Sequence, residues 1–108
     1  WYRESLAHLP VEFHREVGDV RHSYWMCSIL LPDPSQRDPL RNVLAAAGIE
    51  TRPLFYPAHT MPMYAKKFQQ HPVAENLGWR GMNLPSWPGL SRAQVEGICR
   101  EIGAFLKA

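Results

Sequence analysis

Cysteine is scarce in this sequence, since only Cys27 and Cys99 occur among its 108 residues. Two cysteines cannot build the dense disulfide framework that small secreted domains use. Cys27 lies in an apolar run and Cys99 on the apolar face of an expected helix, and both settings suit buried side chains. We therefore expect two buried free thiols, with a single disulfide as the less favoured alternative.

Long apolar runs and concentrated charge are also missing. No apolar stretch approaches the roughly 20 residues needed to cross a bilayer, and no basic start leads into an apolar signal core. The formal net charge is only +2 and the lysines and arginines are scattered, so no basic stripe favours nucleic acid. We expect a cytoplasmic protein with neither a membrane nor a nucleic acid as partner.

The usual motifs of catalysis and metal binding are absent as well. The chain has no Gly-x-Ser-x-Gly turn, no glycine-rich phosphate loop and no pair of carboxylates in an apolar setting. The histidines at positions 14, 22, 59 and 71 do not show the spacing of metal ligands. The chain by itself therefore predicts no catalytic residue and no metal ion.

What the sequence does contain is the pattern of one α/β domain, with 45% hydrophobic residues and a length that suits a single core. The nearly all-apolar run Tyr24–Leu31 predicts a central strand covered on both faces. Ser91 and Gln94 match a capping box before a continuous apolar helical stripe. The expected elements are a helix tail at 1–9, a strand at 11–16, a strand at 24–31, a helix at 38–47, a strand at 49–55, a short helix at 72–77, a strand at 81–84 and a helix at 92–107.

Turn-forming residues set several of these boundaries. Asp38 is the expected cap of the second helix, with Pro39 at its first position and Gly48 closing it. Pro53 cannot donate a hydrogen bond to a neighbouring strand, so its strand is expected to lie at an edge or to end there. We expect an α+β arrangement of the α/β class: a short, mostly antiparallel sheet with the two longer helices packed on one face.

The segment 47–64 carries more functional side chains than a plain connection needs. It leaves a helix, runs as a short strand and breaks into a proline-rich loop that carries Arg52, Tyr56, His59 and Tyr64. A guanidinium and an imidazole can meet an anionic group, and tyrosines can line a pocket. Each residue also has an ordinary alternative, because Arg52 can pair with Glu50 and the tyrosine rings can pack on the core.

The residues that lead into the central strand have a purely structural interpretation. We expect Tyr24 and Trp25 to be core anchors, while His22 and Ser23 finish the preceding turn. An apolar run of this length is typical of a buried strand. This interpretation gives His22 and Ser23 no direct chemical role.

Three stretches in order resemble one known protein family. They are HSYWM at the central strand, GIETRPLFYPAHTMPMY in the segment 47–64, and AENLGWRGMNLPSWPGLS before the last helix. They resemble the C-terminal portion of the DegT/DnrJ/EryC1/StrS family of sugar-nucleotide aminotransferases. Within this family these three stretches are most similar to the perosamine-forming branch. The resemblance to that branch implies a role in polysaccharide biosynthesis and a GDP-linked 4-keto-6-deoxy sugar as substrate.

The resemblance implies a pyridoxal-phosphate (PLP) enzyme of fold type I, a homodimer that takes an amino group from glutamate and passes it to a nucleotide sugar. The chain would be its small C-terminal domain, with residues 1–9 as the tail of the inter-domain helix. The lysine that forms the Schiff base would lie outside this chain. The chain by itself would therefore bind no PLP and would be inactive. The resemblance places Arg52, Tyr56, His59 and Tyr64 on the nucleotide-sugar side, and His22 and Ser23 in a supporting role.

Two other functions remain open at this point. The chain could be a stand-alone module that binds an anionic small molecule with the same loop. It could instead be an interaction domain, with Trp79 and Trp87 marking a surface that meets another protein. A natural reading frame that begins at or just before Trp1 favours the first. The second is favoured if changing Arg52 and His59 leaves activity untouched while changing Trp79 or Trp87 abolishes dimerisation.

Overall fold

The computed structural model describes every residue from Trp1 to Ala108, in four helices, four strands and two short 3₁₀ turns. In chain order these are α1 (Tyr2–Leu6), β1 (Glu12–Phe13), β2 (Cys27–Leu30), the turn η1 (Pro34–Gln36), α2 (Arg37–Ala46), β3 (Arg52–Pro53), the turn η2 (Ala58–Thr60), α3 (Pro72–Arg80), β4 (Gly81–Leu84) and α4 (Arg92–Lys107). None of the helices combines the length and apolar character needed to span a membrane.

The four strands form one antiparallel sheet in the order β1-β2-β4-β3. The predicted short antiparallel sheet is therefore confirmed, and so is the edge position of the strand that contains Pro53. The register pairs Ile29 with Met82 and Ser28 with Asn83. Since side chains alternate along a strand, Ile29 and Met82 share one face, while Ser28 and Asn83 share the other.

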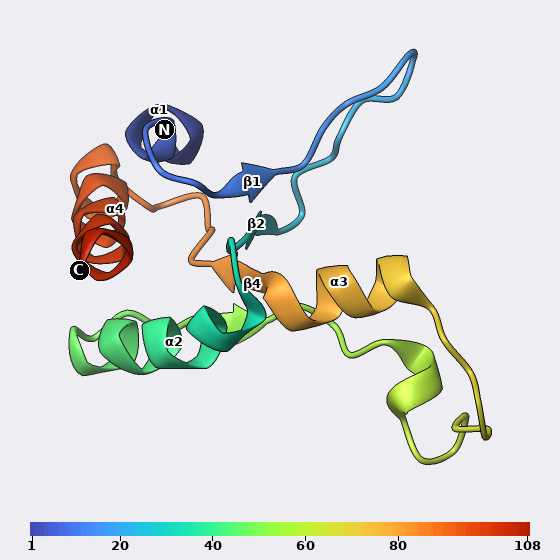
Figure 1. The fold of residues 1–108 in the computed structure, drawn as a ribbon. Coiled ribbons are helices and arrows are strands. Elements are labelled where there is room, and N and C mark those ends of the chain that lie inside the picture. The colour runs from blue at the N-terminus through green and yellow to red at the C-terminus, as the bar shows by residue number, and fades with distance from the viewer.

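The core lies on the face that carries Ile29 and Met82. One cluster of buried side chains joins this face to α1, α2 and α4 (Figure 1). Leu6 of α1, Leu44 of α2 and Ile102 of α4 are fully buried in it. The other face is polar at its centre, where Ser28 Oγ donates a hydrogen bond to Asn83 Oδ1. The prediction that helices pack on one face is thus confirmed.

Two expected strands are much shorter than predicted. β1 covers only two residues of the expected range 11–16, and β3 covers two of the range 49–55. In β3 the reason is physical, because Pro53 has no N–H to donate and the chain turns away soon after it. Pairing resumes for a single bond, from Leu54 N to Gly81 O at 3.0 Å.

The expectation that Tyr24 and Trp25 anchor the core is wrong. β2 begins only at Cys27, and the Trp25 side chain is 75% exposed. Tyr24 has a positive φ of 52°, in the left-handed region that an extended strand cannot include. The apolar run 24–31 thus forms a strand of only four residues, and the two aromatic residues at its start are exposed.

The helix boundaries follow their capping residues, with one correction. α4 begins after Ser91, whose capping box with Gln94 is present as predicted. The second helix is preceded by η1, and the capping box there joins Asp33 and Gln36, so Asp38 is not the cap. α3 also continues past the expected end at residue 77 and passes directly into β4.

Both cysteines are free thiols, as predicted. Cys99 is buried in the core and Cys27 is half-buried. Burial raises the pKa of the Cys99 thiol to about 11 and also raises that of Cys27. Both thiols therefore stay protonated near neutral pH and are poor nucleophiles.

The molecule has two unlike parts, which we name the packed region and the outer region. The packed region is the sheet with α1, α2 and α4. The outer region comprises residues 14–26 and 54–80, which leave the sheet on the same side and diverge from each other (Figure 1). Most of the exposed large apolar side chains belong to it: Val17, Val20, Tyr24, Trp25, Phe55, Tyr56, Met63, Tyr64, Phe68, Val73, Leu77 and Trp79.

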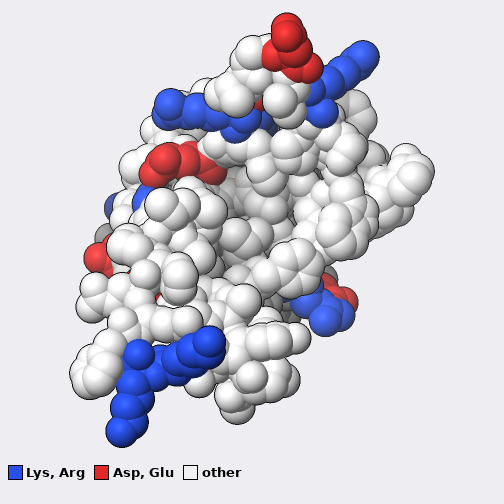
Figure 2. All heavy atoms as spheres, turned by 90° about the vertical axis from the view of Figure 1, so that its right-hand side faces the viewer, with Lys and Arg blue, Asp and Glu red and all other residues white.

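The projecting outer region makes the chain extended for its size. The accessible surface is 7523 Å², against about 6,100 Å² for a compact monomer of this mass. The radius of gyration is 15.0 Å, against about 13 Å for a compact domain of this length. Seen from the projecting side, the surface is broad and mostly uncharged, with charged groups around its margins (Figure 2). Such a surface is typical of one that meets another molecule.

Candidate functional site

Arg52 lies on the edge strand β3, and its partner is the neighbouring Glu50. The guanidinium donates to Glu50 Oε1 from Nε at 3.0 Å and from a terminal nitrogen at 2.7 Å. Both side chains are 77% exposed. The ordinary alternative foreseen for Arg52 is therefore the arrangement observed. An exposed pair of this kind contributes little to stability, so the guanidinium can exchange Glu50 for an anionic ligand at small cost.

His59 lies in the turn η2 and shares a hydrogen bond with Glu75 of α3. Its Nε2 is 2.9 Å from Glu75 Oε1, and the imidazole is only 10% exposed. The ring of His71, the residue just before α3, lies 4.6 Å from the His59 ring between centroids. His59 is thus held between the start of α3 and the residue that precedes it.

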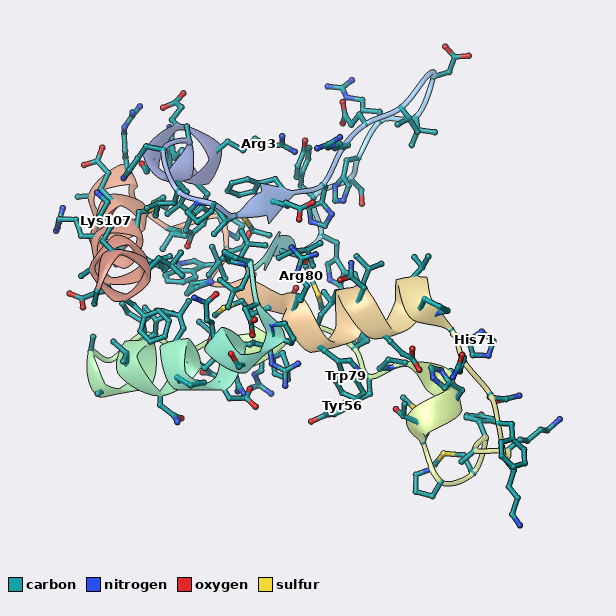
Figure 3. The ribbon with its side chains drawn as sticks, in the orientation of Figure 1. Arg3, Tyr56, His71, Trp79, Arg80 and Lys107 are labelled. Atoms are coloured by element: carbon teal, nitrogen blue, oxygen red, sulfur yellow. The ribbon has the colours of Figure 1, made fainter.

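Tyr56 and the next residue, Pro57, also lie against α3. The Tyr56 ring meets Trp79 edge to face, with ring centroids 6.3 Å apart (Figure 3). A Cβ added to Gly78 would lie 2.8 Å from Pro57 Cδ, closer than real carbon atoms approach. Only glycine at position 78 therefore leaves room for the proline ring. The loop runs along α3 in the opposite direction to the helix.

Tyr64 and His59 line the same pocket, which has a volume of about 550 Å³. Lys66 and His71 also line it, and Lys66 adds a cationic group beside the two imidazoles. The Tyr64 side chain is exposed. A pocket with one tyrosine, two imidazoles and an ammonium group suits a ligand that carries hydroxyl and phosphate groups.

A second pocket, of about 670 Å³, opens between the segment 48–52 and the start of α4. Arg52 lines it together with Trp87, Asn83 and Gln94. Arg52 and His59 are therefore not brought into one cavity in this chain. Of the four residues predicted for the nucleotide-sugar side, the structure brings His59 and Tyr64 together, places Tyr56 against Trp79, and leaves Arg52 in a separate pocket.

The residues His22 and Ser23 lie in the projecting loop 14–26. Ser23 is exposed, whereas the half-buried His22 accepts a hydrogen bond at Nδ1 from Tyr24 N at 2.7 Å. This contact accompanies the positive φ of Tyr24, which turns the chain toward Trp25. The Trp25 ring then lies 6.5 Å from the ring of Phe55 between centroids. His22 thus shapes the turn that presents Trp25.

A second histidine, His14, packs beside His22. The two rings are 4.2 Å apart between centroids, and His14 Nε2 accepts a hydrogen bond from Ser28 N at 3.3 Å. Burial lowers the pKa of His14, and the nearby His22 and Arg3 lower it further. The neutral imidazole, which alone can accept at Nε2, is therefore the favoured form.

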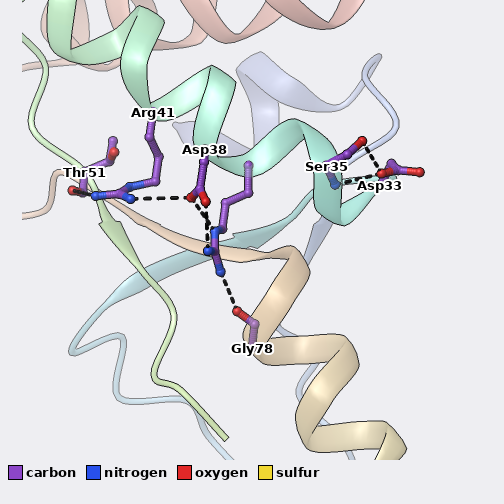
Figure 4. A network of polar contacts seen from close by, with 7 residues as sticks. Asp33, Ser35, Asp38, Arg41, Thr51 and Gly78 are labelled. Carbon is purple, nitrogen blue, oxygen red and sulfur yellow. Dashed lines mark hydrogen bonds and ion pairs between the residues drawn. The ribbon is translucent and has the colours of Figure 1, made fainter. Parts of the chain in front are cut away.

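α3 is fixed to the packed region by two arginines. Arg37 is buried and donates to the Gly78 carbonyl at 2.7 Å, while its Nε pairs with Asp38 at 2.9 Å (Figure 4). Arg80 donates from Nε to the Leu31 carbonyl at 2.6 Å and pairs with Glu12 at 2.6 Å. The hydrogen bond from the Arg37 guanidinium holds the pKa of Asp38 below its usual value. These bonds make α3 a firm support for the loop that lies along it.

The described residues do not by themselves offer the chemistry of amino transfer. The three lysines, Lys66, Lys67 and Lys107, are all exposed, whereas a lysine that forms a Schiff base needs a desolvated amine. The residues of this chain therefore do not fit a PLP attachment site. No group of three or more His, Cys, Asp or Glu side chains is placed to hold a metal ion. The arrangement can bind and orient a polar ligand.

Sequence reasoning missed Glu75 and Gly78 on α3, and it gave Trp79 of the same helix only a possible docking role. Glu75, Gly78 and Trp79 lie three and four positions apart, so they share one helical face. A signal was present, because Glu75 stands in the first turn after His71-Pro72, where a carboxylate is favoured by the helix dipole. What the sequence could not reveal is that the loop 56–59 folds back onto that face.

Comparisons with known proteins agree with one another. The sequence pattern of the DegT/DnrJ/EryC1/StrS aminotransferase family matches residues 1–103. GDP-perosamine synthase of Escherichia coli O157:H7 is 56% identical over 104 residues, which is 96% of this chain and 28% of that relative. GDP-perosamine synthase of Vibrio cholerae is 46% identical over 102 residues, 91% of this chain and again 28% of the relative.

The fold also matches solved structures. DesV of S. venezuelae, solved in complex with a ketimine intermediate, superposes with a TM-score of 0.85 at 26% identity. That match covers 99% of this chain and 29% of DesV. The chain thus spans little more than a quarter of the proteins that it matches.

Proposed function

Because this chain belongs to the DegT/DnrJ/EryC1/StrS aminotransferase family, we propose that it is the substrate-side part of a PLP-dependent sugar aminotransferase. In the parent protein it would act on a nucleotide-linked 4-keto-6-deoxy sugar of the perosamine type, with glutamate as the amino donor. The observation that supports this most strongly is the 56% identity to a GDP-perosamine synthase over nearly the whole chain.

In this proposal the outer region and Arg52 at the neighbouring sheet edge face the nucleotide sugar. Tyr56 and Tyr64 supply aromatic walls with hydroxyl groups, while Arg52 and His59 meet the anionic or hydroxyl groups of the ligand. Arg52 releases Glu50 to do so. His22 has a supporting role through its hydrogen bond to Tyr24 N, and Ser23 belongs to the same turn.

The rest of the parent protein would supply the cofactor and its attachment lysine. The exposed setting of Lys66, Lys67 and Lys107 supports this division. Holding a sugar in a fixed orientation while another domain performs the chemistry is a recognised contribution to rate. We place the parent enzyme in the cytoplasm, as a homodimer.

A chimeric enzyme tests the proposal directly. The part of the E. coli O157:H7 relative that aligns with this chain is replaced by this chain, which is 56% identical to it over 104 residues. We expect the chimera to convert the GDP-linked 4-keto-6-deoxymannose to the amino sugar with glutamate, as followed by mass spectrometry. A folded chimera that loads PLP and yields no amino sugar would contradict the proposal.

The isolated chain provides the complementary test. We expect that incubation with PLP followed by borohydride gives only low labelling scattered over its exposed lysines, because none of them lies in a desolvated site that would bind the cofactor. Stoichiometric labelling of one lysine, detected by a mass increase, would refute the assignment of the cofactor to the rest of the parent.

A further inference from the structure

We propose that Glu75 is a positioning residue for His59, and that through it α3 holds the loop 56–64 in the conformation that binds the nucleotide sugar. The inference rests on the proposed function for its ligand, but its structural part stands on contacts within this chain. Nothing in the resemblance or the comparisons assigns a role to Glu75.

The loop contacts the helix at three places, and later loop residues contact earlier helix residues because the two segments run in opposite directions. Tyr56 lies against Trp79 and Pro57 fits over Gly78, so both inner contacts are apolar. The third contact, at the outer end of α3, joins His59 to Glu75. It is the only polar contact of the three, and it is the one that can fix the direction of a side chain, because hydrogen bonds are directional whereas apolar packing is not.

The chemistry of this contact assigns the proton on His59. A carboxylate can only accept, so the imidazole nitrogen that faces Glu75 must carry hydrogen. With the proton on Nε2, Nδ1 is the ring atom left for another partner. In the neutral ring, Nδ1 can accept a hydrogen bond from a sugar hydroxyl. In the protonated ring, Nδ1–H can donate a hydrogen bond to a phosphate. Without Glu75 the ring is free to rotate or to change tautomer.

Glu75 is itself well placed to act as a fixed point. Its backbone N–H donates to the His71 carbonyl at 2.9 Å, and its side chain is about one-third exposed at 33%. Arg37 and Arg80 tie the far end of α3 to the packed region. The carboxylate is therefore carried by a helix that is anchored at one end, whereas the loop has no other charged link to that helix.

The pocket beside this contact indicates the ligand chemistry. His59, Tyr64 and Lys66 line it together. The ammonium group and the imidazole suit a phosphate group, and the tyrosine hydroxyl suits a sugar. The nucleotide sugar proposed above carries both, so a rotated His59 would remove one of its contacts without touching the reacting carbon.

The test uses the chimeric enzyme with Glu75→Ala and Glu75→Gln. The alanine variant should raise the KM for the nucleotide sugar about tenfold with kcat within about twofold, which is the signature of a lost binding contact. The glutamine variant should stay within about threefold of the parent KM, because its amide oxygen can still accept from Nε2–H. The matched control is Glu96→Ala, a surface pair with Arg92 on α4, which should leave both constants unchanged.

A second measurement does not depend on activity. Lys66 and Lys67 are exposed just after the loop 56–64, so trypsin cleavage after them reports how well the loop is held. Cleavage should be several-fold faster in Glu75→Ala than in Glu75→Gln or the parent chimera. Equal cleavage in all three, or an unchanged KM in Glu75→Ala, would overturn the proposal. An inactive parent chimera would instead count against the proposed function, and the cleavage result would still decide the role of Glu75.

Discussion

The packed region and the outer region use apolar side chains in opposite ways. In the packed region Leu6, Ile29, Leu44 and Ile102 are fully buried in one cluster. In the outer region Trp25 and Phe55 are 75% and 66% exposed, although they are larger and more apolar than most surface residues. The first region holds the fold together. The second carries exposed aromatic side chains that do not contribute to the core, and we interpret them as a surface that contacts another molecule.

The two regions are also held by different forces. The packed region rests on burial of apolar area, which is non-directional and additive over many contacts. The outer region is held at a few points: two arginines, one on α2 and one on α3, a glycine that admits Pro57, and the contact of His59 with Glu75. Variants at these points should therefore change the position of the loop more than the stability of the chain.

The largest expected effect separates the regions by stability. Leu44→Ala should lower the free energy of unfolding by about 2–5 kcal/mol, since it leaves a cavity in a fully buried site. Phe55→Ala should change it by less than about 0.5 kcal/mol, because the ring is mostly exposed. Urea unfolding of both variants measures this. A Phe55→Ala loss as large as that of Leu44→Ala would break the division into two regions.

A pair of glycine variants sharpens the comparison. Gly78→Ala gains about 1 kcal/mol of helix propensity, but its Cβ would lie 2.8 Å from Pro57 Cδ. Overpacking costs about 1–3 kcal/mol, so we expect a net loss of about 1 kcal/mol. In Gly97→Ala the nearest atom is the flexible end of Arg100 at 3.6 Å, so a gain of about 0.5–1 kcal/mol is expected. Thermal unfolding of the two variants gives opposite signs if Pro57 packs as described.

The sequence predicted the packed region well, because its signals are local. The capping box at Ser91, the strand at 81–84 and the helical stripe after it depend on residues within a few positions. The candidate site was predicted only as a set of side chains. Its geometry depends on a loop that returns to α3, so His59 meets Glu75 sixteen positions away, and no periodicity reports such a contact.

The error at Trp25 has the same physical origin. An apolar run indicates that its side chains are buried, but it does not identify the element or partner that covers them. Trp25 is exposed in this chain and lies near Phe55 on the projecting side. The sequence therefore identified an apolar residue correctly and assigned it to the wrong surface.

The pH dependence of the loop 14–26 is a smaller effect. Burial lowers the pKa of His14 below its ordinary value of 6.5. The unfolded chain therefore binds more protons in the window below pH 6.5, so stability should be full above that pH and fall as the pH is lowered through it. Melting temperatures between pH 8 and pH 5 test this. The fall should be smaller in His14→Gln, whose amide oxygen still accepts from Ser28 N without a titratable ring.

The smallest effect is expected for a surface ion pair of the packed region. Arg92 contacts both Glu96 and Glu4, and all three side chains are about half exposed or more. Glu96→Ala should lower the free energy of unfolding by no more than about 0.5 kcal/mol. A loss above about 1.5 kcal/mol in urea unfolding would show that charge contributes to this region more than the apolar core implies.

The central claim is that the outer region, together with Arg52 at the edge of the sheet, receives the ligand, while the buried core of the packed region only supports it. Hydrogen–deuterium exchange of the chimeric enzyme, with and without the GDP-linked amino sugar, tests it most directly. We expect bound ligand to slow exchange in residues 54–64 and to leave the buried turns of α2 and α4 unchanged. Ligand binding that protects α2 and α4 and leaves residues 54–64 unchanged would contradict the claim.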